Sequence, residues 1–224
     1  MKIVITGQKS FGRAVLKRLV NDGHEILGVA VAPQENKKDK MVGTAMRYQI
    51  PIIAEAEKLI SNDIPEETEL IVAAHSHWIV SNKLIAKAKY GAIGFHPSLL
   101  PLHRGRDAVK WTIKMNDKVT GGTIFYLNDI ADGGPVIDRK LLFVDKNWDY
   151  HDLWNKLFDI GVEMIANTVD KIETTRGILP HEEQDEKLAT WEPSFDRPRL
   201  VRNTLKSGKM ANWSSIISEF NYWS

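Results

Sequence analysis

Short apolar runs that alternate with helical segments dominate the first third of the chain. Residues 2–6 form an apolar run typical of a strand, a helix is predicted from Ser10 as N-cap to about residue 21, and residues 25–32 predict a second strand. Strand, helix and strand at this spacing require a crossover between parallel strands, which is right-handed in almost all folds. The pattern therefore predicts an α/β fold in which helices flank a mostly parallel central sheet.

The same two patterns continue through the rest of the chain. Further strands are predicted at residues 50–53, 69–74, 90–95, 120–127 and 134–144. Further helices are predicted at residues 41–48, 81–88, 107–115 and 149–174. A length of 224 residues is enough for one α/β domain with a substantial core. We expect that domain to span residues 1–177, followed by a short irregular C-terminal extension at 178–224 that is not an independent domain.

The composition excludes several classes of protein. The chain has no cysteine, so a disulfide framework and a thiolate metal site are impossible. The N-terminus lacks the apolar region and cleavage site of a signal peptide, and no apolar run approaches the ~20 residues needed to span a bilayer. The net charge of +1 gives no electrostatic case for binding nucleic acid. We therefore expect a cytoplasmic protein with no metal, no membrane association and no nucleic-acid partner.

A histidine at the end of a predicted strand is the first candidate for chemistry. The apolar run at 90–95 leads into His96, and Pro97 and Pro101 then prevent a regular strand or helix because proline lacks an N–H donor. In an open α/β sheet, ligands bind outside the carboxyl ends of the strands, where this imidazole is expected. A loop histidine packed under two prolines is an equally good interpretation of this stretch alone.

A carboxylate after a later strand is the second candidate. Asp132 follows the predicted strand at 120–127 and stands in the sequence Asp-Gly-Gly-Pro. Aspartate and glycine are ordinary turn residues, so Asp132 has a simple structural interpretation. Paired with His96, it would instead be the acid–base partner of an imidazole.

Together these residues form a pattern that resembles the folate-dependent formyltransferase family. The pattern consists of a His-Pro-Ser-Leu-Leu-Pro run that starts at His96, an Arg-Gly pair at Arg104 and an Asp-Gly pair at Asp132. The resemblance covers residues 1 to about 175. The N-terminal glycine pattern, which begins at Gly7, most resembles the 10-formyltetrahydrofolate hydrolase domain within this family. The resemblance implies a Rossmann-like formyltransferase fold and 10-formyltetrahydrofolate as the co-substrate.

The resemblance also implies roles for the central residues. In formyl transfer, a nucleophile attacks the formyl carbon while charge builds on the formyl oxygen. His96 would hydrogen-bond that oxygen and help proton transfer, and Asp132 would orient a water molecule or the imidazole and accept a proton. The asparagine that completes the family's trio is replaced by Gly94. Losing such a donor typically costs about 100- to 1000-fold in rate, and a water in the space above Gly94 is one candidate substitute.

This departure leaves three functions open. The first is transfer of the formyl group from 10-formyltetrahydrofolate to an amino group of a small-molecule acceptor. The alternative is hydrolysis of the same compound to tetrahydrofolate and formate, because the family's hydrolase domain also lacks the asparagine. The second alternative is a folate-binding protein without catalytic activity.

The resemblance assigns the folate contacts to two loops. The contact positions in the first loop are His77, Trp78, Ile79 and Val80. Those in the second loop are Asn128, Asp129, Ile130 and Ala131. Contacts of this kind are mostly made by the main chain, so varied side chains do not exclude folate. A metal site at His75 and His77 is not predicted, because two ligands are too few.

Acceptor binding is predicted at a β–α turn and in the loop after His96. The backbone N–H groups of Gly7, Gln8 and Lys9 are suited to an anionic group, although tight packing explains this turn equally well. Further predicted substrate contacts are Ser98, Arg104 and Arg106. Guanidinium groups bind carboxylates and phosphates bidentately, but anchoring of the loop is an equally good interpretation of the arginines.

Aromatic residues gather in the last part of the extension. They are Trp213, Phe220, Tyr222 and Trp223. We expect them to dock on the body of the protein or on a second subunit of a homodimer. The tail is too short for the additional β-domain of methionyl-tRNA formyltransferases and is not strongly basic, which counts against tRNA as the acceptor.

Overall fold

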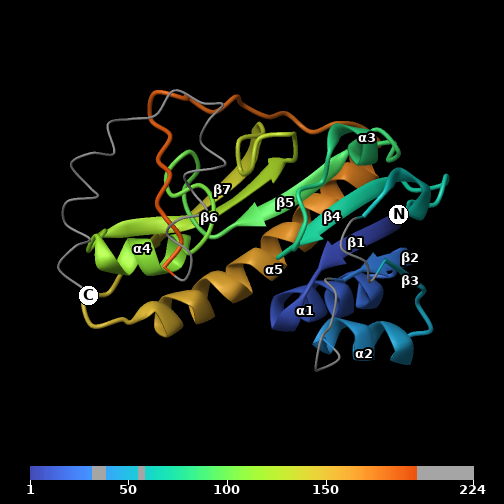
Figure 1. The fold of residues 1–224 in the computed structure, drawn as a ribbon, viewed down its shortest axis with the longest axis horizontal. Coiled ribbons are helices and arrows are strands. Elements are labelled where there is room, and N and C mark those ends of the chain that lie inside the picture. Colours follow the sequence, from blue (N-terminus) through green and yellow to red (C-terminus); the bar gives the residue numbers. More distant parts are fainter. Residues whose placement is uncertain (32–38, 55–58, 196–224) are drawn as a thin grey trace.

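Parallel strands form most of a central sheet in the computed structural model of the chain, which describes residues 1–31, 39–54 and 59–195. Within these residues seven strands pair in the order β3-β2-β1-β4-β5-β6-β7 (Figure 1). The strands are β1 (Lys2–Gly7), β2 (Glu25–Ala30), β3 (Ile52–Ala54), β4 (Leu70–Ala74), β5 (Ala92–His96), β6 (Val119–Tyr126) and β7 (Val136–Phe143). Strands β1 to β5 are parallel, and β6 and β7 are added antiparallel. The predicted α/β fold with a mostly parallel sheet is confirmed.

Helices cover both faces of this sheet. They are α1 (Lys9–Asn21), α2 (Lys40–Arg47), α3 (Asn82–Ile85), α4 (Ala108–Lys114) and α5 (Tyr150–Thr175), with a 3-10 turn at Ser61–Asp63. The prediction that Ser10 caps the first helix is wrong: Gln8 is the N-cap, and its side chain makes no capping hydrogen bond. The helix predicted at 81–88 is shorter than expected and ends at Ile85. None of the helices in the described residues is long and apolar enough to cross a membrane.

Alternating side chains of the strands build a separate core on each face. On β1, Ile3 and Ile5 are fully buried in the cluster that includes residues of α1, α2 and α5. The residue between them, Val4, is buried in a second cluster with Leu84 of α3. Full burial of one such side chain stabilises the fold by about 1.5–3 kcal/mol. Because neighbours on a strand face opposite sides, a shift of one residue would move each set into the core shaped for the other.

Close packing explains the glycine that ends β1. A Cβ atom added to Gly7 would lie under 3.0 Å from the carbonyl oxygen of Ala74 at the end of β4. Backbone atoms at both ends of this contact leave no flexible group to move aside. Tight packing, one of the two interpretations of this turn, is therefore sufficient to explain the glycine.

The chain beyond α5 returns across the molecule. In Figure 1 this segment leaves the end of α5, crosses above β5 and β7, and descends toward α4. It makes isolated bridges at two places, between Glu182 and Val136 and between Trp191 and Arg104. The segment is otherwise irregular, as expected. The four tail aromatics on which a homodimer was predicted lie outside the described residues.

Candidate active site

The imidazole of His96 lies where β5 ends, at the carboxyl edge of the sheet. His96 is 5% exposed, and its Nε2 atom lies 2.6 Å from the carbonyl oxygen of His103. Since a carbonyl oxygen only accepts hydrogen bonds, Nε2 must carry the proton of that bond. The other ring nitrogen, Nδ1, lies 3.6 Å from Oδ2 of Asp132. The structure therefore brings the two central residues of the prediction together and directs Nδ1 toward the carboxylate.

Asp132 is held in an unusual backbone conformation. Its φ angle is +52°, in the left-handed region that aspartate tolerates better than most residues. Its Oδ2 atom accepts a hydrogen bond from the backbone N–H of Gly105 at 2.8 Å, and its carbonyl oxygen accepts one from the side chain of Gln184 at 2.9 Å. The carboxylate is 23% exposed. It is thus fixed on the protein side and open to a ligand on the other.

The position of the family asparagine is occupied by hydrocarbon. Gly94 precedes His96 by two residues on β5, so both face the same side of the strand. A Cβ atom on Gly94 would lie 2.9 Å from Cδ2 of Leu127 and 3.4 Å from Cε1 of Phe125. A substitute water in this space is therefore not supported, because these neighbours are apolar and offer it no hydrogen bonds.

The two loops predicted to bind folate lie against each other. The backbone N–H of Asn82 donates to Oδ1 of Asp129 at 3.0 Å, and the Asn82 side-chain amide donates to the other carboxylate oxygen. Beside this tie, Ile79 is 61% exposed and Ile130 is 52% exposed. Large exposed apolar side chains at the mouth of a site are suited to the face of a flat ring.

Internal hydrogen bonds shape each of these loops. The Ser76 hydroxyl donates to the carbonyl oxygen of Trp78 at 2.9 Å, and Oδ1 of Asn128 accepts from the N–H of Ile130 at 2.9 Å. His77 is exposed, whereas Val80 is buried in the core beside α3, so its side chain is not available to a ligand. Ala131 is half-buried next to Asp132.

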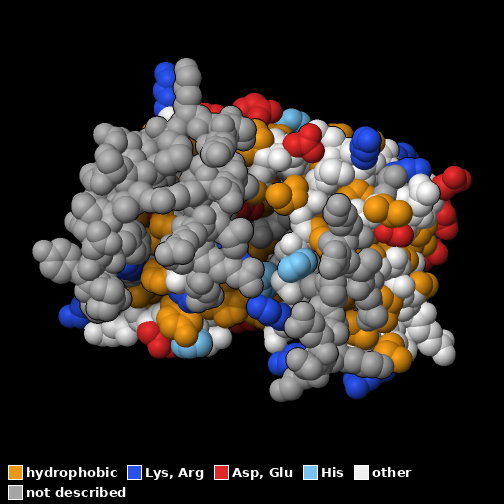
Figure 2. Space-filling model, viewed as in Figure 1, with side chains coloured by type: hydrophobic (Ala, Val, Ile, Leu, Met, Phe, Trp, Pro, Cys, Tyr) orange, Lys and Arg blue, Asp and Glu red, His pale blue; other side chains and the backbone are white. Residues whose placement is uncertain are grey.

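A positive cluster that the sequence only partly predicted lies at the same edge. His75, which follows β4, interacts electrostatically with Lys9, Arg106 and Asp39. Desolvation lowers the pKa of His75, and the charges of Lys9 and Arg106 lower it further against the opposing effect of Asp39. Figure 2 shows histidine side chains and Lys or Arg side chains beside a hollow near the centre of this face. The sequence singled out Lys9 and Arg106, but it did not indicate that their charges act on His75.

Three predicted substrate contacts have other partners. The backbone N–H of Lys9 donates to Oδ2 of Asp39 at 2.7 Å, so this N–H is not left for an anion. Ser98 is fully buried, and its hydroxyl donates to the carbonyl oxygen of Leu102. Arg104 is 1% exposed and is held by residues far along the chain, so loop anchoring describes it and anion binding does not. Gly7 is buried and Gln8 is half-buried at the start of α1.

A buried histidine that the sequence analysis missed adjoins the site. Nε2 of His103 lies 2.9 Å from a carboxylate oxygen of Asp117, and Nδ1 lies 3.1 Å from one of Glu192. Desolvation by burial lowers the pKa of His103, but the hydrogen bonds and charges of Glu192 and Asp117 outweigh it and raise the pKa overall. No local sequence signal marks this group, because its partners come from distant segments.

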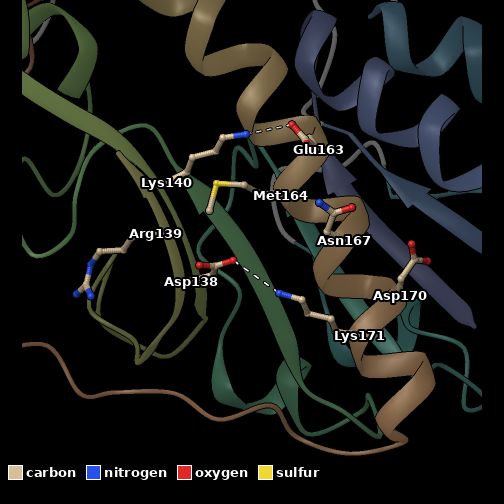
Figure 3. A pocket seen from close by; sticks show the side chains of 8 residues that line it. All are labelled: Asp138, Arg139, Lys140, Glu163, Met164, Asn167, Asp170 and Lys171. Carbon is tan, nitrogen blue, oxygen red and sulfur yellow. Dashed lines mark hydrogen bonds and ion pairs between the residues drawn. The ribbon is translucent and has the colours of Figure 1, made fainter. Parts of the chain in front are cut away.

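Two other features lie away from His96. Among the described residues, His24, Asp170 and Glu173 have the side chains and the proximity to hold a metal ion, but the Met1 ammonium group already makes an ion pair with Glu173. A cavity of about 380 Å³ lies between β7 and α5. Figure 3 shows its charged lining, in which Lys140 pairs with Glu163 and Lys171 with Asp138. None of the predicted site residues lines this cavity.

Comparisons with known proteins identify the family to which the chain is similar. The family model described as formyl transferase matches residues 1–169. The chain is 30% identical over 219 residues to the methionyl-tRNA formyltransferase of Bacillus subtilis. The alignment covers 93% of this chain and 68% of that protein. It is 32% identical over 204 residues to the cytosolic 10-formyltetrahydrofolate dehydrogenase of Xenopus laevis, covering 86% of this chain but only 22% of that protein.

Solved structures of similar shape carry related names. One is the N-formyltransferase of Helicobacter canadensis in complex with folinic acid and dTDP-3-aminofucose, with a TM-score of 0.69, 18% identity, and coverage of 86% of this chain and 70% of that one. Another is the phosphoribosylglycinamide formyltransferase of Bacillus halodurans, with a TM-score of 0.67, 20% identity, and coverage of 79% and 97%. At these identities the likeness shows the fold.

Proposed function

This chain belongs to the formyl transferase family, and from that premise we propose that it transfers a formyl group from 10-formyltetrahydrofolate to an amino group of a small-molecule acceptor. The observation that carries the proposal is the contact between His96 and Asp132. The imidazole is 5% exposed and the carboxylate is 23% exposed. An imidazole beside a carboxylate at the carboxyl edge of the sheet is suited to moving a proton during acyl transfer.

The two loops tied by Asn82 and Asp129 fit the folate co-substrate. Exposed Ile79 and Ile130 offer apolar contacts to a flat ring, and nearby backbone groups offer hydrogen bonds to its edge. When bound there, 10-formyltetrahydrofolate supplies an activated formyl group. The chain's own residues then have to orient that group, exclude competing nucleophiles and move a proton.

Hydrogen bonding of the ring assigns the proton transfer to one atom of His96. Because Nε2 already donates to the carbonyl oxygen of His103, Nδ1 is the nitrogen that can take up a proton from the attacking amine. The bond from the amine nitrogen to the formyl carbon forms, the bond from that carbon to the folate nitrogen breaks, and the folate nitrogen takes a proton. The Asp132 carboxylate, 3.6 Å away, stabilises the positive charge that Nδ1 acquires.

Hydrolysis of 10-formyltetrahydrofolate is the second candidate function. It is favoured by one observation, the apolar surroundings of Gly94, which leave the formyl oxygen without a side-chain donor at that position. In hydrolysis, water replaces the amine as the nucleophile while the roles of His96 and Asp132 stay the same. The similarity to the cytosolic 10-formyltetrahydrofolate dehydrogenase of Xenopus laevis covers only 22% of that protein.

The positive cluster at the carboxyl edge favours an acceptor that carries an anionic group. Lys9 and Arg106 are exposed, and their charges act on His75 at the end of β4. We therefore expect an amine attached to a phosphate or carboxylate, such as an amino sugar nucleotide or a ribonucleotide amine. The cytoplasmic location, the place in one-carbon metabolism and the homodimer remain predictions of the same proposal.

The test is tetrahydrofolate release from 10-formyltetrahydrofolate, first without an amine and then with a panel of phosphorylated and nucleotide-linked amines. Release only with an amine would identify a transferase and its acceptor, whereas release without one would identify the hydrolase. The variant His96→Ala should abolish either activity, and His151→Gln, an exposed histidine on α5, serves as the matched control. Tight folate binding without turnover under all conditions would contradict both enzyme functions and leave a folate-binding protein.

A further inference from the structure

The segment at residues 182–192, which we call the strap, contacts both loops that carry the central pair. It follows α5 and lies beyond the family match, which ends at residue 169. The sequence predicted only an irregular extension here. Its hydrogen bonds, however, reach the Asp132 loop, the loop after His96 and the buried His103.

The first contact is made by a buried amide. Gln184 is 8% exposed, and its Nε2 donates to the carbonyl oxygen of Asp132 at 2.9 Å and to that of Gly134 at 2.6 Å. Its Oε1 accepts from Nε and Nη2 of Arg104 at 3.1 and 2.8 Å. One side chain of the strap therefore links the loop that presents the carboxylate to the loop that follows His96.

The second contact is made by Thr190, through its hydroxyl and its backbone. Its hydroxyl accepts from the N–H of His103 at 2.7 Å, and its carbonyl oxygen accepts from the N–H of Arg104 at 3.0 Å. Its own N–H donates to the carbonyl oxygen of Pro101 at 3.1 Å. The strap thus hydrogen-bonds to the backbone N–H of His103, whose carbonyl oxygen accepts the hydrogen bond from His96 Nε2.

The third contact is an ion pair at the end of the strap. Glu192 is 9% exposed, and its carboxylate lies 3.1 Å from Nδ1 of His103. Asp117 lies on the opposite nitrogen of the same ring. The imidazole of His103, whose carbonyl oxygen accepts from His96, therefore has a carboxylate next to each of its ring nitrogens.

We propose that the strap aligns the catalytic pair, with Gln184 as a positioning residue for Asp132 and with Thr190 as a positioning residue for His96. The inference rests on the proposed function, since alignment is needed for the proton transfer assigned to this pair. A misplacement of about 1 Å in such a pair can cost about 100-fold in rate. In the alternative, the strap only adds stability, and its loss leaves the pair in place.

The variant Gln184→Glu separates these two roles. A glutamate keeps an acceptor for Arg104 but removes both N–H groups that hold the carbonyl oxygens of Asp132 and Gly134. We expect kcat for tetrahydrofolate release to fall about 100-fold with little change in KM. The matched control is Glu183→Gln, an exposed neighbour on the strap, which should behave as wild type. A cooperatively folded Gln184→Glu protein with the kcat of wild type would overturn the proposal.

A second readout does not depend on activity. The backbone N–H of Gly105 donates to the Asp132 carboxylate, so its hydrogen-exchange rate reports where that carboxylate is. We expect exchange at Gly105 to rise about tenfold in Gln184→Glu and to stay unchanged in the control. If wild type releases no tetrahydrofolate under any condition, the proposed function fails, while this exchange measurement still decides whether the strap positions Asp132.

A third variant covers the case in which Gln184→Glu does not fold. Thr190→Val keeps the shape of the side chain and removes only the hydroxyl that accepts from the N–H of His103. We expect a lower kcat, and a smaller fraction of His96 rings protonated at Nε2 in the imidazole ¹⁵N spectrum. A kcat and a His96 spectrum that both match wild type would remove the strap from the alignment of His96.

Discussion

Replacing Gly94 with asparagine returns a side-chain donor to the place where the family resemblance expects one. Gly94 faces the same side of β5 as His96, so an amide there places a donor on the side of the strand where the formyl group has to bind. We expect Gly94→Asn to raise formyl transfer relative to hydrolysis, because in the family resemblance the asparagine is part of the formyl-transfer site and is missing from the hydrolase domain. Only a donor aligned with the developing oxyanion lowers the barrier, so the change should appear in kcat more than in folate binding.

The structure sets the size of both the gain and the cost. One oxyanion donor is worth about 100- to 1000-fold in rate, or about 3–4 kcal/mol of barrier. The new Cβ atom would lie 2.9 Å from Cδ2 of Leu127, which is the far end of a flexible side chain and can turn away. Overpacking of this kind costs about 1–3 kcal/mol of stability. The donor lowers the activation barrier, whereas the overpacking lowers the free energy of unfolding. We therefore expect a faster but less stable enzyme.

The assay measures formate and formylated amine in the same reaction mixture, once an acceptor has been found. Leu127→Ala makes room for the asparagine, so the double variant should recover stability relative to Gly94→Asn, and Leu127→Ala alone is the control for that change. If Gly94→Asn folds and binds folate but leaves the product ratio flat, the missing donor does not explain the choice between transfer and hydrolysis.

Two further predictions concern stability. Burial lowers the pKa of His103 but the carboxylates on either side raise it overall, so its contribution to the free energy of unfolding is fully present below about pH 6.5 and is lost as the pH rises through the raised pKa. Urea midpoints at about pH 6 and about pH 9 should therefore differ more in wild type than in His103→Asn, and equal differences would contradict the assignment. Gly7→Ala should lower the free energy of unfolding by about 1–3 kcal/mol in urea titrations, because its Cβ atom meets the backbone oxygen of Ala74. Gly43→Ala, on α2 with open space around its Cβ atom, is the control and should be neutral or stabilising.

Local patterns predicted the sheet because strands and helices depend on short stretches of sequence, whereas only the family resemblance implied that His96 and Asp132 act together. An apolar run that ends in His-Pro places the imidazole at the carboxyl edge of a parallel sheet. The connection from β6 to β7 begins at the other end of β5, because Tyr126 pairs with Ile93 and Thr123 with His96, so the loop has to fold back to bring Asp132 within 3.6 Å of the imidazole. The same pairing also places Phe125 opposite Gly94, which shows why the space above that glycine is apolar. That last detail needs the register of β5 against β6, which periodicity alone does not give.

Arg104 illustrates what the sequence could not reveal. Its neighbours in sequence suggested a basic loop next to the site, with anion binding and anchoring equally plausible. Its actual partners, Gln184 and Glu186, lie 80 and 82 residues further along the chain. No periodicity links positions at such a separation, so the choice between the two interpretations required the folded chain.

The strap also changes where the functional unit ends. A boundary at residue 177 would remove the Gln184 and Glu186 oxygens that pair with Arg104, together with Trp191, which packs against the guanidinium. The hydrogen bonds from the N–H groups of His103 and Arg104 to Thr190 would be lost as well, so the loop after His96 would be free to open. Opening that loop displaces His103, whose carbonyl oxygen fixes the tautomer of His96. We therefore expect the proposed chemistry of residues 1–169 to depend on residues 182–192, and we propose that the functional unit ends beyond Glu192 rather than at the end of α5.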